Sequence, residues 1–412
     1  MPTPGLPARR AALAMLDAVL RRGETLDQAA GHALRQVAGE ADRGLARAIA
    51  SEALRWKQDL DALIDSATSK RLPDDAKPRA VLAMMLAQWL RLDTPPHAVI
   101  ATGLPLLAGG PRRLAHGVFS TLVKREASLP EYPTLPEPIR TRWGERASAI
   151  AMGLAEPPPL DLALRDAAGT QAWAERLGGV SLLPGHVRLQ RGDAIEQLDG
   201  FGEGAWWVQD IAASLPARLL GPGAGRRVLD LCAAPGGKTL QLAAAGWQVT
   251  ALDNNASRMD RLKDNLARTG LSAQAVIADA LQWQPGEAFD AVLLDAPCTA
   301  TGTCRRHPDV LHRIGVRQIA EMAGLQARLI ARAVSWLKPG GVFVYAVCSL
   351  EREEGEEQAR RVALRRFPVD PGEVPGGVSI SPEGWLCTDP GMLGEAGGMD
   401  GFFIARWIAS PA

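Results

Sequence analysis

The stretch V-L-D-L-C-A-A-P-G-G-K-T at positions 228–239 constrains the fold more than any other part of the chain. Val228, Leu229 and Leu231 form a short apolar run that is typical of a buried strand, and Pro-Gly-Gly then predicts a sharp turn. A helix is expected to start near Lys238. Glycines in such a turn let main-chain N–H groups approach a ligand closely, and the helix start adds partial positive charge. The stretch therefore predicts a strand, a tight turn and a helix that together bind a small polar cofactor.

The residues after this stretch predict a doubly wound, mainly parallel α/β sheet of the Rossmann-like kind. Apolar runs alternate with helical patterns, as such a sheet requires. The expected strands lie at 228–231, 248–252, 275–277, 291–294 and 342–347, with helices between them, for example at 257–269 and 318–337. Ligands of these sheets bind at the carboxyl ends of the strands. Polar residues at those ends are therefore the candidates for a site.

Three cofactor classes use a glycine turn of this kind. A phosphate-binding loop needs G-x-x-x-x-G-K-[ST]; Gly237, Lys238 and Thr239 fit its end, but Cys232 stands where the first glycine belongs. The dinucleotide pattern G-x-G-x-x-G is absent. Carboxylates follow the next two expected strands: Asp253 can accept from both hydroxyls of a ribose, and Asp279 from an adenine amino group. These features favour a cofactor that contains a nucleoside.

Two cysteines provide the most specific chemical signal. Cys298 follows the fourth expected strand in D-A-P-C, and Cys348 follows the fifth in Y-A-V-C-S. A single free cysteine usually packs as a small apolar side chain, and we interpret Cys304 and Cys387 in that way. Two cysteines at the ends of different strands of one sheet can instead face the same cleft. C5 of a pyrimidine becomes nucleophilic only after a thiolate has attacked C6, and two thiols can divide attack and release.

These motifs resemble those of the S-adenosylmethionine-dependent RNA (cytosine-5-)-methyltransferase family. The closing sequence G-G-M-D-G-F-F-I-A-R-W at 397–407 extends the resemblance over nearly the whole chain. The resemblance implies that Cys348 is the nucleophile, that Cys298 assists product release, and that Asp295 hydrogen-bonds the cytosine edge and supports protonation at N3. It also implies an S-adenosylmethionine site made of Cys232, Ala233, Ala234, Pro235, Gly236, Gly237, Lys238, Asp253, Asp279 and Asp295.

The first part of the chain predicts an all-α bundle. Leu13, Leu16 and Leu20 fall on one helical face, Thr25 with Gln28 forms a capping box, and further helices are expected at about 42–64 and 77–92. The sequences at 8–20 and 41–56 resemble the NusB-like RNA-binding domain. A NusB-like bundle ahead of a cytosine-5 methyltransferase resembles the layout of the bacterial enzymes that modify small-subunit (16S) ribosomal RNA.

We therefore expect four segments. Residues 1–128 form the NusB-like domain, the proline-crowded residues 129–159 a linker, 160–220 a small α/β subdomain that precedes the core, and 221–412 the methyltransferase domain. The pair Trp206 and Trp207 is expected to pack in the core of the small subdomain rather than to stack on a base.

The composition of the chain limits which binding partners and which cellular compartment we expect. Five cysteines without C-x-x-C spacing argue against a disulfide framework and a metal site, and favour the reducing cytoplasm. A formal net charge of zero gives no overall field for nucleic acid, so RNA as the partner follows from the resemblance. Cations just past Cys298 are candidates for phosphate contacts, namely Arg305, Arg306, His307 and Arg313. No membrane span and no obligate protein partner is evident.

Other functions stay open at this point. A transfer RNA cytosine is the close alternative substrate, and the helical first domain favours ribosomal RNA. A different class is an RNA-binding ribosome-assembly factor whose methyltransferase core has lost its activity. The presence of both cysteines and of the aspartates at 253, 279 and 295 argues against this class. A P-loop ATPase would use residues 291–295 as its metal-binding strand, and Cys232 is the objection to it.

Overall fold

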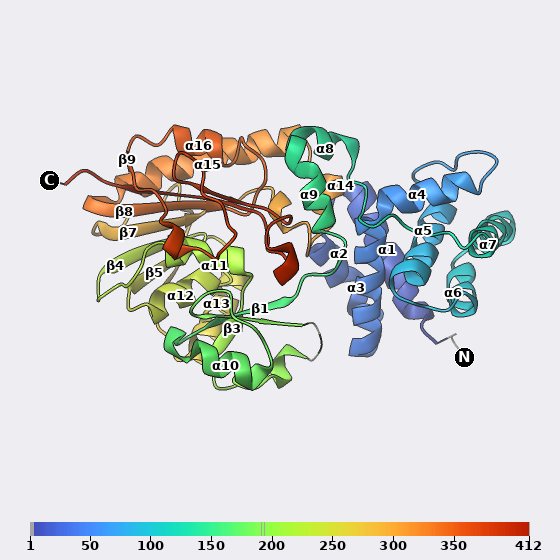
Figure 1. Cartoon of the computed structure of the whole chain (residues 1–412), viewed down its shortest axis with the longest axis horizontal. Coiled ribbons are helices and arrows are strands. Elements are labelled where there is room, and N and C mark those ends of the chain that lie inside the picture. Colours follow the sequence, from blue (N-terminus) through green and yellow to red (C-terminus); the bar gives the residue numbers. More distant parts are fainter. Residues whose placement is uncertain (1–3, 191, 193, 412) are drawn as a thin grey trace. The chain divides into compact units, whose positions relative to one another are not determined.

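The computed structural model describes residues 4–190, 192 and 194–411. The chain divides into two compact units, coloured along the sequence in Figure 1. The helical unit comprises Met1–Glu156 together with Cys304–Ile314, and the sheet unit comprises Pro157–Thr303 and Gly315–Ala412. Residues 304–314 therefore belong to the helical unit although they follow the Cys298 segment of the sheet unit along the chain.

The helical unit is an all-α bundle, which confirms the predicted fold class of this part of the chain. Its helices are α1 (Leu6–Arg22), α2 (Leu26–Ala33), α3 (Glu40–Arg55), α4 (Lys57–Ser66), α5 (Lys77–Arg91), α6 (Pro96–Gly103), α7 (Gly109–Lys124), α8 (Glu137–Trp143), α9 (Ala147–Met152) and the short α14 (Val310–Arg313). The predicted capping box is present at the start of α2. Thr25 Oγ1 accepts from the Gln28 N–H at 3.2 Å, and the Gln28 side chain accepts from the Thr25 N–H at 3.1 Å.

Two segments differ from the sequence-based expectation. The helix expected at 42–64 is broken at Trp56, which ends α3 and begins α4 with non-helical backbone angles. The Trp56 ring is 1% exposed and the Arg91 guanidinium lies 4.9 Å from its centre, so burial of a large ring at the corner fixes the break. The proline-crowded segment 129–159 contains the helices α8 and α9 instead of an irregular linker. Pro138 does not prevent α8, because it stands in the first turn of the helix, where a proline is tolerated.

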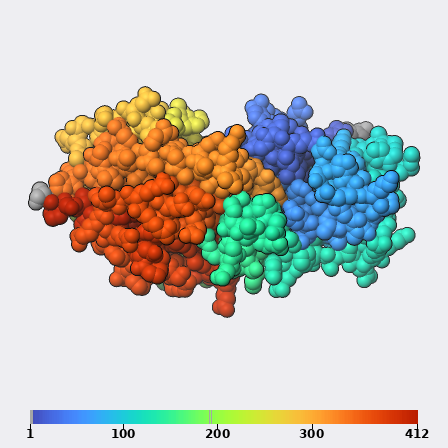
Figure 2. Space-filling view, turned by 90° about the horizontal axis from the view of Figure 1, so that it is seen from above, coloured from blue at the N-terminus to red at the C-terminus, as the bar shows by residue number. Residues whose placement is uncertain are grey.

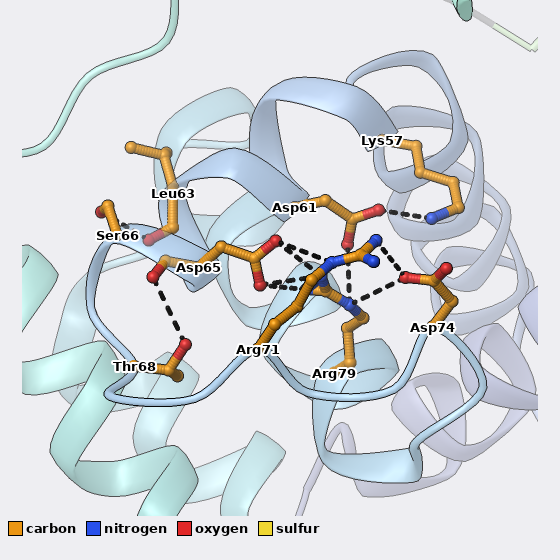
Figure 3. Close-up of polar contacts among 9 residues, drawn as sticks. All are labelled: Lys57, Asp61, Leu63, Asp65, Ser66, Thr68, Arg71, Asp74 and Arg79. Carbon is orange, nitrogen blue, oxygen red and sulfur yellow. Dashed lines mark hydrogen bonds and ion pairs between the residues drawn. The ribbon is translucent and has the colours of Figure 1, made fainter.

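A buried arginine joins α4, α5 and the loop between them. Arg79 is 2% exposed, and its two terminal nitrogens donate three hydrogen bonds of 2.8 Å to the Asp65 carboxylate. Asp61 and Asp74 lie farther away, at 3.5 and 3.7 Å from Arg79 Nε. Figure 3 shows both of these side chains beside Arg79. Asp65 is therefore the main counter-charge of a guanidinium that has left water, and the arrangement ties α4 to α5.

We expect Asp65→Ala to destabilise the helical unit by about 2 kcal/mol, because the substitution removes charged hydrogen bonds from a buried donor. Two more distant carboxylates remain, which keeps the loss below that of an isolated buried charge. Urea titration of the full chain, with hydrogen exchange measured in α5, would give the value. Asp75→Ala in the same loop is the control, since Asp75 is exposed. Equal stability of the two variants would contradict this account of Arg79.

The sheet unit begins with a small antiparallel sheet. Strands β1 (Leu160–Leu164), β2 (His186–Leu189) and β3 (Trp206–Val208) pair in the order β2-β1-β3, with α10 (Thr170–Leu177) between β1 and β2. Trp206 and Trp207 are 0% and 3% exposed. Their burial confirms that this pair packs in the core.

The larger sheet confirms the doubly wound, mainly parallel prediction. Its order is β10-β11-β8-β7-β4-β5-β6, and β8, β7, β4, β5 and β6 run parallel. Strand β11 pairs antiparallel with β8, and β10 pairs antiparallel with β11. The strands are β4 (Arg227–Leu231), β5 (Gln248–Asp253), β6 (Gln274–Ile277), β7 (Phe289–Asp295), β8 (Leu337–Val347), β9 (Arg365–Arg366), which pairs with β11, β10 (Leu386–Thr388) and β11 (Phe402–Ile408). The helices are α11 (Ile211–Arg218), α12 (Gly237–Ala244), α13 (Ala256–Thr269), α15 (Val316–Ser335) and α16 (Glu356–Arg360).

Alternate residues of the central strands pack into two apolar layers, one on each face of the sheet. Val228 of β4 packs in the layer that contains Ile211 of α11, and its neighbour Leu229 packs in the opposite layer with Leu329 of α15. Because successive side chains of a strand point to opposite faces, a continuous apolar run such as that of β7 serves both layers. In the space-filling view of Figure 2, the orange and red part of the chain forms one continuous surface.

None of the helices in the described part of the chain is both long enough and apolar enough to span a bilayer.

Candidate functional site

The loop between β4 and α12 has the backbone that a close approach to a ligand requires. Cys232 and Gly236 both have positive φ, 60° and 111°, and α12 starts at Gly237. A Cβ atom on Gly236 would also lie 3.0 Å from Leu262 Cγ, so glycine is needed there for space as well as for conformation. The turn and the helix start are where the sequence predicts them.

The end of β5 holds this loop in place. The Ala233 N–H donates to the Leu252 carbonyl at 3.1 Å, and the Ala234 N–H donates to the Asp253 carboxylate at 3.2 Å. The other carboxylate oxygen of Asp253 accepts from the Asn255 N–H at 2.9 Å. Asp253 is 3% exposed, so its carboxylate supports the loop from inside the fold. Asp279 is exposed and caps the turn after β6, accepting from the Leu281 N–H at 2.9 Å.

A cavity of about 400 Å³ opens beside the loop at the carboxyl ends of β4 and β7. Its lining includes Asp230, Cys232, Ala233, Ala234, Pro235, Gly237, Lys238 and Asp295, together with Phe201, Gln209, Asp210 and Arg268. The volume suits a small organic cofactor. Most residues that the sequence analysis assigned to the cofactor line this cavity. Gly236, Asp253 and Asp279 are not among its lining residues.

Asp230 gives this cavity an acceptor without a partner. Its Oδ2 accepts from the Thr239 hydroxyl, whereas its Oδ1 is buried and has no hydrogen bond within the described residues. Burial raises the pKa of Asp230 to about 7. An unmatched buried acceptor on a cavity wall suits a ligand that carries N–H donors. S-adenosylmethionine has an ammonium group and a size within this range, so the residues present fit it.

Lys238 is directed to Asp295 across the same cavity. Its Nζ donates to Asp295 Oδ2 at 2.8 Å and lies 5.3 Å from the centre of the Phe402 ring. Burial opposes the charge of Lys238, but attraction by Asp295, followed by that of Cys348, outweighs it and raises the pKa of the lysine. The sequence left open what Lys238 contacts. In the structure its charge is matched by Asp295 at the end of β7.

The two cysteines at the ends of β7 and β8 come together. Cys298 Sγ and Cys348 Sγ lie 3.4 Å apart, and both residues are partly exposed. The hydrogen bond with Cys348, and then burial, raise the pKa of Cys298 well above its usual value. The two sulfurs are close enough for the pair to share one proton. Cys304 is fully buried, consistent with its interpretation as a packing residue.

The residues predicted to contact RNA all lie in 304–314, the segment that belongs to the helical unit. Arg305 departs from the expectation: it is 2% exposed, and its carbonyl accepts from Arg55 Nη2 at 2.8 Å. Arg313 is mostly buried and donates to Asp309 at 2.8 Å. The His307 side chain is 42% exposed, and Arg306 is partly buried. A run of cationic residues in a sequence does not show which of their side chains are buried within the fold and which are exposed to a ligand.

Sequence reasoning gave no role to several residues near the site. Gln209 and Asp210 line the cavity from the small subdomain, and only their place after the paired tryptophans set them apart in the sequence. Glu354 is buried between the two cysteine segments. Its sequence context, E-R-E-E-G-E-E, is that of an exposed acidic surface, so no local signal distinguishes it.

Two family models match separate parts of the chain. A family model described as "16S rRNA methyltransferase RsmB/F" matches residues 217–408, and a model of the NusB family matches residues 6–106.

Known proteins resemble the chain over nearly its full length. A protein named "Ribosomal RNA small subunit methyltransferase B" from Xylella fastidiosa is 34% identical over 98% of both chains, and one of the same name from Klebsiella pneumoniae is 33% identical over 97% of both. The crystal structure of PH0851 is 22% identical and superposes with a TM-score of 0.71 over 98% of this chain and 99% of the other. A methyltransferase homologue from Pyrococcus horikoshii, 26% identical, has a TM-score of 0.56 over 66% and 93%.

Proposed function

The chain belongs to the RsmB/F family of S-adenosylmethionine-dependent methyltransferases, and from that premise we propose that it methylates C5 of a cytosine in 16S ribosomal RNA. S-adenosylmethionine is the cofactor of this family. The observation that carries the proposal is the 3.4 Å separation of Cys298 Sγ and Cys348 Sγ at the ends of two adjacent parallel strands. Methylation of a base nitrogen or a ribose hydroxyl needs no pair of thiols.

The chemistry begins at Cys348. Its thiolate attacks C6 of the cytosine, a C6–S bond forms, and the electrons of the C5=C6 double bond make C5 nucleophilic. S-adenosylmethionine, when bound, supplies an electrophilic methyl group. Once C5 carries the methyl, its proton leaves to a base, the C5=C6 double bond re-forms and the C6–S bond breaks. The thiolate of Cys348 is thereby regenerated.

We assign release to Cys298. Its raised pKa keeps its proton on sulfur while the neighbouring thiolate of Cys348 is present. When Cys348 becomes a thioether it loses its charge, and with it the repulsion that opposed ionisation of Cys298. Cys298 can then lose its proton to solvent, and the resulting thiolate serves as the base that takes the C5 proton.

Asp295 and Lys238 hold the base and the charge that develops on it. The Asp295 carboxylate, fixed by Lys238, supports protonation at N3 of the cytosine, which draws electrons away from C6 and favours attack there. The loop residues 232–238 with Asp230 would hold the cofactor, and Asp253 would act at least partly through the loop that it supports.

The substrate can be named by mapping 5-methylcytosine with bisulfite in ribosomal and transfer RNA from cells that lack the protein. We expect one 16S cytosine to lose its methyl group, and to regain it with the wild-type gene but not with Cys348→Ser. If a transfer RNA cytosine loses its methyl group instead, the substrate is transfer RNA and not 16S ribosomal RNA. If every 5-methylcytosine stays in place, the proposed reaction is wrong.

A further inference from the structure

Glu354 is an acidic side chain buried at the junction of the two cysteine segments. It is 0% exposed, and it lies in the loop that leads from Cys348 to α16. Carboxylates are rarely buried to this extent unless hydrogen bonds match them. Its partners therefore indicate what it does.

The partners come from both sides of the thiol pair. Thr299, next to Cys298, donates its N–H to Glu354 Oε2 at 2.9 Å and its hydroxyl to Oε1. Ser349, next to Cys348, donates its hydroxyl to Oε1 at 3.0 Å. One carboxylate thus binds the immediate neighbour of each cysteine.

Two further contacts keep this carboxylate in place. Gln326 of α15 donates from Nε2 to Glu354 Oε2 and to the Pro297 carbonyl, both at 2.9 Å. The Glu354 carbonyl accepts from the Tyr345 hydroxyl at 2.6 Å. A Cβ atom on Gly355 would lie 2.8 Å from Phe403 Cγ, so the backbone after Glu354 is packed directly on β11.

Other hydrogen bonds also join the two cysteine segments. Thr301 Oγ1 accepts from the Leu350 N–H at 3.0 Å, and the Gly302 N–H donates to the Cys348 carbonyl at 3.0 Å. These bonds join the backbones farther along the Cys298 segment. The Thr299 and Ser349 hydroxyl oxygens also lie 3.3 Å apart. Glu354 Oε1 accepts from both of these hydroxyls, so its carboxylate orients the residues directly after each cysteine.

We propose that Glu354 is a positioning residue whose carboxylate ties the Cys298 segment to the Cys348 segment and so sets the distance between the two thiols. The proposal rests on the proposed function, because that function needs one thiol to attack and the other to assist release at the same base. Glu354 touches neither sulfur in the structure, so it acts through Thr299 and Ser349.

The direct test measures how close the thiols are, without any RNA. Diamide takes up two hydrogen atoms as two neighbouring thiols become a disulfide, and peptide mapping identifies the Cys298–Cys348 product. We expect Glu354→Ala to slow formation of this disulfide about tenfold, because the sulfurs no longer share a fixed geometry. Glu353→Ala, an exposed neighbour, is the matched control and should react like the wild type.

The conservative variant separates positioning from simple loss of structure. In Glu354→Gln the amide oxygen can accept from the Thr299 N–H and Gln326, and the amide nitrogen can donate to hydroxyls that rotate to accept. We therefore expect Glu354→Gln to keep most of the disulfide rate and of the methylation rate. In Glu354→Ala, kcat should fall about 10²-fold, as for a small misplacement of reacting groups, whereas S-adenosylmethionine binding should persist.

An unchanged disulfide rate in a folded Glu354→Ala protein would overturn the proposal, whatever the RNA assay shows. If that variant does not fold, Thr299→Val takes its place, since it removes one hydroxyl donor and keeps the backbone bond. A slower disulfide rate in Thr299→Val supports positioning, and an unchanged rate overturns it. Failure of the wild type to methylate cytosine would instead refute the proposed function and leave the thiol measurement standing.

Discussion

Replacement of Cys348 by serine should lower the rate of methyl transfer to cytosine by at least about 10³-fold. A serine hydroxyl at this position stays protonated at neutral pH, and an alkoxide is not available to attack C6. Without the C6–S bond C5 has no enamine character, so every later step stops. The substitution changes one atom, and it should leave binding of S-adenosylmethionine unaltered.

The measurement is transfer of a labelled methyl group to the RNA under single-turnover conditions, with cofactor affinity measured in parallel. Cys387→Ser is the matched control, because Cys387 lies in β10 and takes no part in the proposed chemistry. It should keep the wild-type rate. Substantial residual transfer by Cys348→Ser would show that C5 is methylated without this nucleophile.

The architecture of the sheet unit was largely predictable from periodicity. Short apolar runs that alternate with amphipathic helices allow few arrangements other than a parallel sheet with helices on both faces. The run at 291–294 lies within β7, and the run at 228–231 lies within β4, each with alternate residues in opposite layers. The position of residues 304–314 in the helical unit was not predictable, because it depends on contacts between parts of the chain about 250 residues apart.

Helix ends inside the bundle were predictable only where a local rule decides them. The capping box of Thr25 and Gln28 satisfies backbone groups within four residues, and it appears as expected. The break at Trp56 is decided by what surrounds the ring, including Arg91 from another helix. Prolines at 129–159 indicated a linker, yet the same residue type also starts helices.

The candidate site shows the same division between local and distant causes. The glycine turn and the two cysteines were found because their chemistry depends on residue type and on strand ends. Asp253 was expected at the cofactor, and its carboxylate holds the loop by the Ala234 N–H. Arg305 was expected at the surface, and its burial follows from packing that no spacing encodes. Glu354 could be found only in three dimensions, since the sequence does not show that Glu351 and Glu354 are the buried ones among several neighbouring glutamates.

Replacement of Cys298 by alanine should produce the opposite result from that of Cys348: RNA should stay covalently attached to the protein. In this variant Cys348 can still attack C6 and C5 can still receive the methyl group. The C5 proton then has no nearby sulfur base, because the side chain that lay 3.4 Å from Cys348 Sγ has been removed. Turnover should fall about 10²-fold or more, in the range that general acid–base groups contribute.

The adduct should be visible as a slower band on a denaturing gel, and it should survive reducing agent because the bond is a thioether and not a disulfide. It should require S-adenosylmethionine if the block follows methyl transfer. The double variant Cys298→Ala, Cys348→Ser is the control and should give no adduct, since the attacking sulfur is missing. An adduct in Cys348→Ser alone would reverse the two roles: Cys298 would then be the sulfur that attacks, and the protonated partner would be Cys348.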